Sequence, residues 1–327
     1  MRVAVLGTGH LGREHARIYA SMPDVDLAGV YDIDPNSSAA TARQAGCRVF
    51  RSPTSLFASA DAVSVCVPTP AHAEVGSACL EAGLHVLMEK PISDTVTDAR
   101  TLRDLAAKKK RVLQVGHIER FNPAMQAAAQ HLDAPRFVEC HRLARFGRRG
   151  ADVAVVLDLM IHDIDLLLAV IRGDVLEINA SGVAVLSGST DIANARLRFR
   201  NGCVANITAS RISLERMRKI RFFQQDSYLS VDLLREQVAM YRKRPGFDLS
   251  VFHEAMARGE SPDLLRAIEP VAVRIDREEP LQAELYSFVS AVRERRSPVV
   301  GAEDGIRALE VACEIERLLR EEDGCAS

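Results

Sequence analysis

Three acid–base side chains recur within one otherwise apolar stretch, at Asp158, His162 and Asp165. Their spacing of i, i+4 and i+7 predicts that they share one face of a helix. Burying such polar groups without hydrogen-bond partners costs several kcal/mol, so their presence on an apolar helix indicates a structural or a catalytic role. One interpretation is a general base, His162, oriented by Asp158. The other is a core histidine satisfied by Asp158. A metal site including His117 or His141 is weaker, because nothing fixes a third ligand.

A glycine pattern near the start of the chain predicts a dinucleotide site. The run Gly7-Thr8-Gly9-His10-Leu11-Gly12 directly follows a predicted strand and opens a predicted helix, whose first N–H groups suit phosphates. Asp32 ends the second predicted strand, where a carboxylate accepts hydrogen bonds from the adenosine ribose. That carboxylate would repel the 2′-phosphate of NADP, and the next two residues supply no cation. The sequence therefore predicts NAD as cofactor.

Two further loops are expected where the nicotinamide would lie, beyond the carboxyl ends of later strands. They are Pro68-Thr69-Pro70-Ala71-His72 and Glu89-Lys90-Pro91. The proline after Lys90 fixes the backbone, so the ammonium can point at a substrate oxygen. Taken alone, Lys90 is better described as a solvated surface lysine than as a catalytic one.

Hydrophobic patterning predicts the strands and helices on which these residues lie. Up to residue 118, apolar strand-like runs alternate with helix-like stretches, which predicts an α/β, doubly wound Rossmann domain over residues 1–118. The expected strands are Arg2–Leu6, Val25–Tyr31, Ala62–Val67, His85–Met88 and Arg111–Val115, and the expected helices are Arg13–Ser21, Ser37–Ala45, Ala71–Ala82 and Asp94–Lys108.

The pattern of residues 119–327 differs from that of the first domain. It predicts an α+β domain for substrate binding and oligomerisation, with a largely antiparallel, open sheet. Asn201-Gly202 between two alternating runs is a strong hairpin signal. The expected helices are Pro123–His131, Val153–Ile171, Gln282–Arg295 and Asp304–Arg320, and the expected strands are Arg136–Leu143, Asn194–Arg200, Cys203–Arg211, Lys219–Phe223, Tyr228–Leu233 and Gln237–Tyr241.

Length and composition agree with this division. A chain of 327 residues favours two domains, and 47% hydrophobic with 26% charged residues is typical of a globular protein. The net charge of -2 gives no field that would attract nucleic acid or a membrane. The seven scattered cysteines suit reduced thiols, and the first strand begins too close to Met1 for a signal peptide, so we expect a cytoplasmic protein.

Together these motifs resemble the glucose–fructose oxidoreductase/inositol dehydrogenase/rhizopine-catabolism (Gfo/Idh/MocA) family over nearly the whole chain. The resemblance implies that Lys90, Asp158 and His162 are catalytic, with His162 as base and Lys90 polarising the hydroxyl. It also implies cofactor contacts from the glycine run, Asp32, Pro68, Thr69, His72, Glu89 and Lys90. The motifs that carry the resemblance are Gly7–Gly12, Asp32, Pro68–His72, Glu89-Lys90-Pro91, Gly116-His117-Ile118-Glu119-Arg120-Phe121-Asn122-Pro123, Asp158-x-x-x-His162-x-x-Asp165 and the closing run from Pro298 to Leu309.

Within this family, His141–Leu143, Asp158–Asp165 and Gly116–Pro123 are similar to the UDP-N-acetylglucosamine 3-dehydrogenases. These enzymes make a 3-keto nucleotide sugar for a PLP aminotransferase in lipid A biosynthesis. The basic segment Arg142–Arg149 suits a diphosphate, because guanidinium groups match phosphate oxygens. Arg211, Arg216 and Arg218 are the alternative clamp. The residues expected at the substrate are Lys90, Arg120, Asn122, Arg145, Arg149, Asp158 and His162.

Three functional classes stay open at this point. The first is a nucleotide-sugar dehydrogenase, and the second is a family member that oxidises a free sugar or inositol. The third is a non-catalytic NAD-binding sensor or regulator, against which the joint presence of Lys90, Asp158 and His162 counts. In each case we expect a homo-oligomer, dimer or tetramer, with no metal site.

Overall fold

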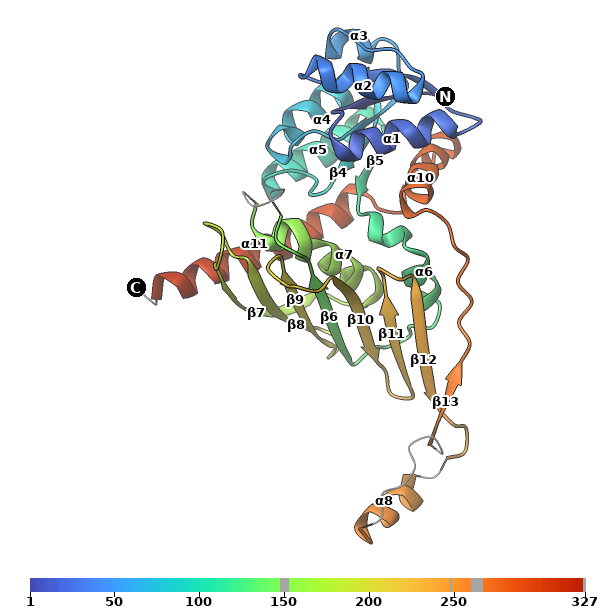
Figure 1. Ribbon diagram of the computed structural model, residues 1–327, viewed down its shortest axis with the longest axis vertical. Coiled ribbons are helices and arrows are strands. Elements are labelled where there is room, and N and C mark those ends of the chain that lie inside the picture. The colour runs from blue at the N-terminus through green and yellow to red at the C-terminus, as the bar shows by residue number, and fades with distance from the viewer. Residues whose placement is uncertain (148–152, 248, 260–266, 326–327) are drawn as a thin grey trace. The chain divides into compact units, whose positions relative to one another are not determined.

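The computed structural model describes residues 1–147, 153–247, 249–259 and 267–325 (Figure 1). Its contacts divide the chain into two compact units. Unit 1 comprises Met1–Phe121, Ile164–Leu168 and Glu278–Glu314, and unit 2 comprises Asn122–Asp163, Ala169–Arg277 and Ile315–Ser327. The first unit therefore includes two segments from beyond residue 118, where the sequence suggested a boundary.

Unit 1 is built on a five-stranded parallel sheet in the order β2-β1-β3-β4-β5. Val49 also pairs with Val30 of β2 in an isolated parallel bridge. This bridge lies next to β2, at the position that a further parallel strand occupies in a dinucleotide-binding sheet. The predicted doubly wound domain is confirmed. The strands are β1 (Arg2–Leu6), β2 (Asp26–Tyr31), β3 (Ala62–Val65), β4 (His85–Glu89) and β5 (Leu113–Gly116).

Helices connect these strands, and side-chain caps set several of their starts. Asp34 accepts a hydrogen bond from the Asn36 N–H at the start of α2, and Thr95 accepts one from the Asp98 N–H at the start of α5. The sequence did not predict α3, a single short turn. The helices are α1 (His10–Ser21), α2 (Pro35–Ala45), α3 (Pro53–Phe57), α4 (His72–Glu81), α5 (Val96–Lys109) and α10 (Pro280–Glu294).

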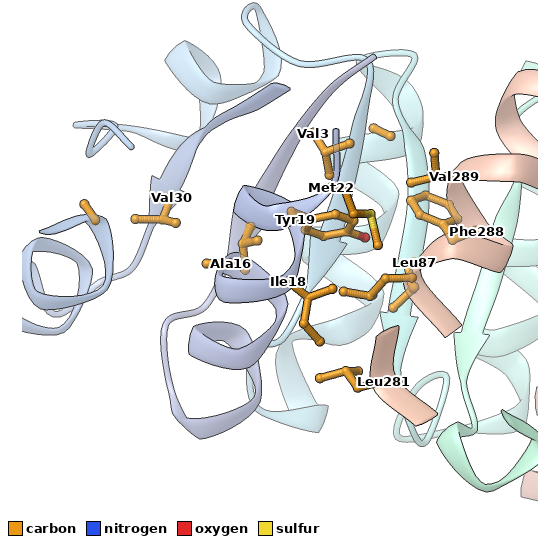
Figure 2. Packing of buried hydrophobic residues seen from close by; sticks show 14 residues of the cluster. Val3, Ala16, Ile18, Tyr19, Met22, Val30, Leu87, Leu281, Phe288 and Val289 are labelled. Carbon is orange, nitrogen blue, oxygen red and sulfur yellow. The ribbon is translucent and has the colours of Figure 1, made fainter. Parts of the chain in front are cut away.

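The core of unit 1 joins the two ends of its sequence. Tyr19 of α1, Leu87 of β4 and Phe288 of α10 are fully buried in one cluster (Figure 2). Burying each such side chain contributes about 1.5–3 kcal/mol, which ties α10 firmly to the Rossmann fold. Sequence patterning predicted this helix but not its packing partners.

Unit 2 contains an eight-stranded sheet in the order β13-β12-β11-β10-β6-β9-β8-β7, and among its described strands only the β6–β9 pair is parallel. This confirms the largely antiparallel sheet, although β7 and β13 were not predicted. Gly202, with φ of +85°, forms the predicted turn. The strands are β6 (Phe137–Leu143), β7 (Val175–Val183), β8 (Ile192–Phe199), β9 (Val204–Ser210), β10 (Met217–Phe223), β11 (Ser227–Asp232), β12 (Gln237–Lys243) and β13 (Ile268–Val271).

The helical part of unit 2 differs from prediction at one important point. The expected helix Val153–Ile171 is a π-helical turn, η3 (Val156–Met160), that continues into α7 (Ile161–Val170). The other helices are α6 (Pro123–Ala129), α8 (Leu249–Ala257) and α11 (Ala302–Cys325), which begins in unit 1. Within the described residues, no helix has both the length and the apolar character to cross a membrane.

Candidate active site

The glycine run forms a tight loop between β1 and α1. Gly7 has φ of +86°, and a Cβ there would lie 2.5 Å from the Cys66 carbonyl oxygen. A Cβ on Gly12 would lie 1.8 Å from the Gly7 carbonyl oxygen, so both glycines are required by close approach. At Gly9 a Cβ would meet no described atom within 4 Å, which leaves the loop open on that side.

The amino end of α1 adds an anion-binding surface to this loop. The helix begins at His10, and its first turn contains no acidic residue. His10 and Leu11 are both exposed there. Helix N–H groups beside a glycine loop suit a diphosphate, so the donors present fit a dinucleotide.

Asp32 stands at the end of β2, directly across from the same loop. Its Oδ2 accepts hydrogen bonds from the backbone N–H and the hydroxyl of Thr8, and its Oδ1 accepts one from the Asp34 N–H at 2.9 Å. Burial alone would raise the pKa of Asp32, but these hydrogen bonds outweigh burial and lower it. The carboxylate is therefore ionised at neutral pH, and the next residue, Ile33, is 90% exposed. Because this surface is negatively charged and offers few hydrogen-bond donors, it fits the hydroxyl groups of a ribose better than a phosphate group.

His72 joins the two loops that follow β3 and β4. Its Nδ1 lies 2.8 Å from the Pro91 carbonyl oxygen, and its Nε2 lies 2.9 Å from the Val67 carbonyl oxygen. The neutral ring donates to one of these oxygens at a time. The predicted cofactor residues Pro68 and Thr69 lie in the bridged loop, and Thr69 begins a 3-10 turn. Lys90, which immediately precedes Pro91, lies on the other loop and is half-buried.

Glu89, the last residue of β4, points into the unit rather than into solvent. Its Oε1 lies 3.0 Å from the buried Nε2 of His15, and a Cβ at Gly116 would lie 3.1 Å from its carboxyl group. His15, Cys66 and Glu89 bring three potential metal-ligand atoms within 4.8 Å of one another. Burial, which is the largest cause, raises the pKa of the Cys66 thiol well above its usual value.

Arg120 and Asp165 form a bidentate ion pair within unit 1. Arg120 donates from Nε at 2.7 Å and from Nη2 at 2.9 Å to the two carboxylate oxygens. Asp165 is almost fully buried, and the buried His117 Nδ1 lies 4.0 Å from it. Asp304 lies 3.5 Å from the same guanidinium group. Asp165, predicted to share a face with Asp158 and His162, thus has an internal partner.

In unit 2, the predicted base His162 and its predicted partner Asp158 lie where the helix changes from π-helical to α-helical geometry. Asp158 lies in the π-helical turn and His162 in the first turn of α7, and both are half-buried. The spacing argument assumed one uninterrupted α-helix, so the shared face was derived from the wrong helical period. Single π-helical turns are frequent at functional sites. The next residue, Asp163, pairs with Arg142 in the interior of unit 2.

The residues predicted to bind substrate occupy different environments. The Asn122 Nδ2 donates to the Leu233 carbonyl oxygen, and its Oδ1 caps α6 by accepting from the Ala124 N–H. Arg145 is exposed and donates from Nε to the Leu214 carbonyl oxygen at 2.9 Å. Arg149 lies outside the described residues, as does Arg148. Arg142 and Arg211 are buried beside carboxylates, which leaves Arg145 as the exposed arginine of the predicted segment among the described residues.

Comparison with known proteins places both units in one family. A model of an oxidoreductase family with an NAD-binding Rossmann fold matches residues 1–117, and a model of the GFO/IDH/MocA C-terminal domain matches residues 124–226. A UDP-N-acetylglucosamine 3-dehydrogenase of Acidithiobacillus ferrooxidans is 36% identical over 316 residues, 96% of each chain. The chain belongs to the GFO/IDH/MocA oxidoreductase family. The resemblance inferred from the motifs is thereby confirmed.

Other comparisons show how far the likeness extends within the GFO/IDH/MocA family. A solved structure of the Acidithiobacillus enzyme aligns with a TM-score of 0.87 over 98% of this chain and 97% of that chain, at 36% identity. A myo-inositol 2-dehydrogenase of Thermotoga maritima is 26% identical over 340 residues, 98% of this chain and 97% of the relative. This GFO/IDH/MocA member is therefore an oxidoreductase with NAD as cofactor, as predicted.

Several residues that support the site in this GFO/IDH/MocA protein were not found from the sequence. Thr8 holds Asp32, and its hydroxyl inside the glycine run was the available signal. Asp163, which engages Arg142, lies off the i, i+4, i+7 spacing from which the site was predicted. Asp304, beside Arg120, gave no signal, because residues so far apart in sequence are brought together only by folding.

Proposed function

We propose that this protein oxidises the C3 hydroxyl of UDP-N-acetylglucosamine with NAD, giving the 3-keto nucleotide sugar. The observation that carries the proposal is 36% identity over 96% of each chain to a UDP-N-acetylglucosamine 3-dehydrogenase. The inositol dehydrogenase that matches over a similar length is 26% identical. The sequence motifs indicate the same branch of the family.

The chemistry requires one proton and one hydride to leave the carbinol. In the proposal, His162 removes the hydroxyl proton, while Lys90 donates a hydrogen bond to the same oxygen and stabilises its developing negative charge. Asp158 stabilises the protonated imidazole. Bound NAD supplies the hydride acceptor, held by the glycine loop and Asp32. The carbon–oxygen bond becomes a carbonyl as both leave.

The remote diphosphate would orient the sugar. Within the predicted segment Arg145 is exposed, whereas Arg142 is held by Asp163. In the alternative clamp Arg211 is held by Asp191 and Arg216 is exposed. We assign the diphosphate contact to Arg145 and to Arg149, with Arg216 as the alternative. Binding energy from this remote group positions the reacting carbon, so a free sugar should react poorly.

The test is to supply NAD with UDP-N-acetylglucosamine, UDP-glucose, N-acetylglucosamine and myo-inositol in parallel. A PLP aminotransferase and an amino donor are added, because the oxidation equilibrium is expected to favour the alcohol. The proposal expects NADH and a 3-amino sugar with the first substrate only. NADH formed with myo-inositol but not with the UDP-sugar would instead establish the second function class, which the inositol dehydrogenase relatives favour. No turnover with any substrate would favour an NAD sensor.

A further inference from the structure

A cationic pocket opens at the amino-terminal edge of the parallel sheet in unit 1, with a volume of about 1130 Å³. The starts of β4 and β5, the ends of α5 and α10 and the first turn of α11 line it. The glycine loop, Asp32 and Lys90 all follow the carboxyl ends of strands, at the opposite edge. Because a strand rises about 3.3 Å per residue, the five residues of β4 separate the two edges by about 13 Å.

Positive charge dominates the lining of this pocket. Its acidic residues are Glu303 and Asp304. Cations are favoured at the carboxyl ends of helices, which accounts for part of the accumulation. Its basic residues include Arg103, Lys110, Arg111, Arg293, Arg295 and Arg296.

Only half of these cations are neutralised by neighbouring carboxylates. Arg103 pairs with Asp104 and Glu303, Arg293 with Asp24 and Arg296 with Glu294. Across the described ranges of the chain, Lys110, Arg111 and Arg295 have no ion pair with a carboxylate. All three are exposed at the pocket. The pocket therefore holds an excess of guanidinium and ammonium donors.

The contact between His85 and Arg111 brings two hydrogen-bond donors together at the pocket. The Val112 backbone N–H donates to Nδ1 of His85 at 2.9 Å, so Nδ1 carries no hydrogen. The neutral ring must then carry its hydrogen on Nε2. Arg111 Nη1, which is also a donor, lies 3.3 Å from that Nε2. Burial, followed by the charge of Arg111, lowers the pKa of His85, which keeps the ring neutral. Two donors thus converge where an anionic oxygen would accept from both.

We propose that this pocket binds a phosphate-bearing small molecule, whose oxygens accept hydrogen bonds from His85 Nε2 and from Arg111 and Arg295. Guanidinium groups match phosphate oxygens in bidentate geometry, and several cations around one cavity favour a multiply charged anion over a single carboxylate. The volume admits a nucleotide or a sugar phosphate as well as a free ion. Since the site lies at the edge opposite the cofactor loop, its lining residues are separate from the glycine loop and Asp32.

Isothermal titration calorimetry with inorganic pyrophosphate tests this site. Saturating NAD is present throughout, so that the glycine loop cannot account for binding. The expected result is a saturable pyrophosphate site whose Kd rises with salt and rises further in the pocket variants. Arg111→Gln and Arg295→Gln should each raise the Kd about tenfold, the loss expected for a charge-assisted contact. His85→Asn keeps an acceptor for the Val112 N–H but removes the Nε2 donor, and should weaken binding similarly.

The matched control is Arg51→Gln, which removes an exposed arginine outside the pocket and should leave the Kd unchanged. Absence of pyrophosphate binding to the NAD-loaded protein would overturn the proposal. An equal Kd in the three pocket variants and in Arg51→Gln would also overturn it. Circular dichroism verifies folding, and Arg295→Gln decides the matter if His85→Asn does not fold, because Arg295 is exposed.

Discussion

Arg142 on β6 and Asp163 on α7 form a buried bidentate ion pair, with Nε donating to Oδ2 at 2.9 Å and Nη2 donating to Oδ1 at 2.8 Å. Both side chains are about 3% exposed, so neither charge is hydrated. Asp163 immediately follows His162, and the pair therefore anchors the helical turn that carries the proposed base. Removing one partner from such a pair is far more costly than removing both.

Asp163→Ala should accordingly destabilise the protein by about 3–5 kcal/mol, because Arg142 loses its carboxylate partner in the interior. Urea unfolding followed by circular dichroism measures the change. The control is the double variant Arg142→Met/Asp163→Leu, which should recover most of the loss. If the double variant is no more stable than Asp163→Ala, the ion pair is not the reason for the destabilisation.

Asp32 should set the preference for NAD. Replacing Asp32 with Ser and Ile33 with Arg removes a carboxylate and adds a phosphate partner. The ratio of kcat/KM for NAD to that for NADP should then fall by about tenfold or more, since each 1.4 kcal/mol corresponds to a factor of ten. Asp32→Asn is the control, because its amide oxygen can still accept from Thr8. Equal use of NADP by the unmodified protein would contradict the assignment of Asp32 to the ribose.

His162→Ala and Lys90→Ala should each abolish most turnover while NAD still binds. Loss of a general acid–base group typically lowers kcat by a factor of about 10² to 10⁴. Stopped-flow measurement of NADH gives kcat, and fluorescence titration gives the Kd for NAD. Asp158→Asn should have a smaller effect, because the proposed base itself is retained. Near-normal turnover in either alanine variant would show that the replaced residue has a structural role and not a catalytic one.

Glu284 should make the protein less stable as the pH rises. Its side chain is fully buried, and neither carboxyl oxygen has a hydrogen-bond partner in the described part of the chain. Burial, and then the charges of Glu89 and Asp165, raise the pKa of Glu284 well above its usual value. The folded protein therefore holds a proton that the unfolded chain releases above its ordinary carboxyl pKa.

The stability contributed by this bound proton is present at low pH and is lost as the pH rises toward the folded pKa. Glu284→Gln should remove that dependence, a difference of up to about 1.4 kcal/mol per pH unit. Chemical unfolding of both proteins between pH 5 and pH 8, in steps of about one unit, measures it. Parallel curves for the two proteins would show that Glu284 is ionised in the folded state.

His72 provides a test between cofactor binding and loop bracing. Both of its ring nitrogens already face the carbonyl oxygens of Val67 and Pro91. His72→Asn can keep only part of this bridge, so we expect a loss of stability of about 1–2 kcal/mol, the scale of one or two hydrogen bonds. The Kd for NAD should stay within about threefold, a change below 1 kcal/mol. A large rise in that Kd with unchanged stability would support the direct cofactor contact predicted from the sequence.

Local patterns along the chain were enough to predict the fold of the Rossmann unit, the sheet edge at which the glycine loop, Asp32 and Lys90 lie, and the family. Local signals sufficed there, because each strand is a short apolar run and the glycine loop, Asp32 and Lys90 follow strands directly. The Asn201-Gly202 turn was predicted for the same reason, since its backbone geometry depends on two adjacent residues. These features need no knowledge of distant parts of the chain.

The partners of the buried charges became evident only in the folded chain. Arg120 engages Asp165 and Asp304, Arg142 engages Asp163, and α10 completes the core around Tyr19. In the folded chain, a π-helical turn that contains Asp158 stands where the sequence predicted the start of an α-helix. Spacing along a sequence predicts which side chains share an element. Ion pairing and burial depend on contacts between segments tens to hundreds of residues apart, and only the packed chain brings these together.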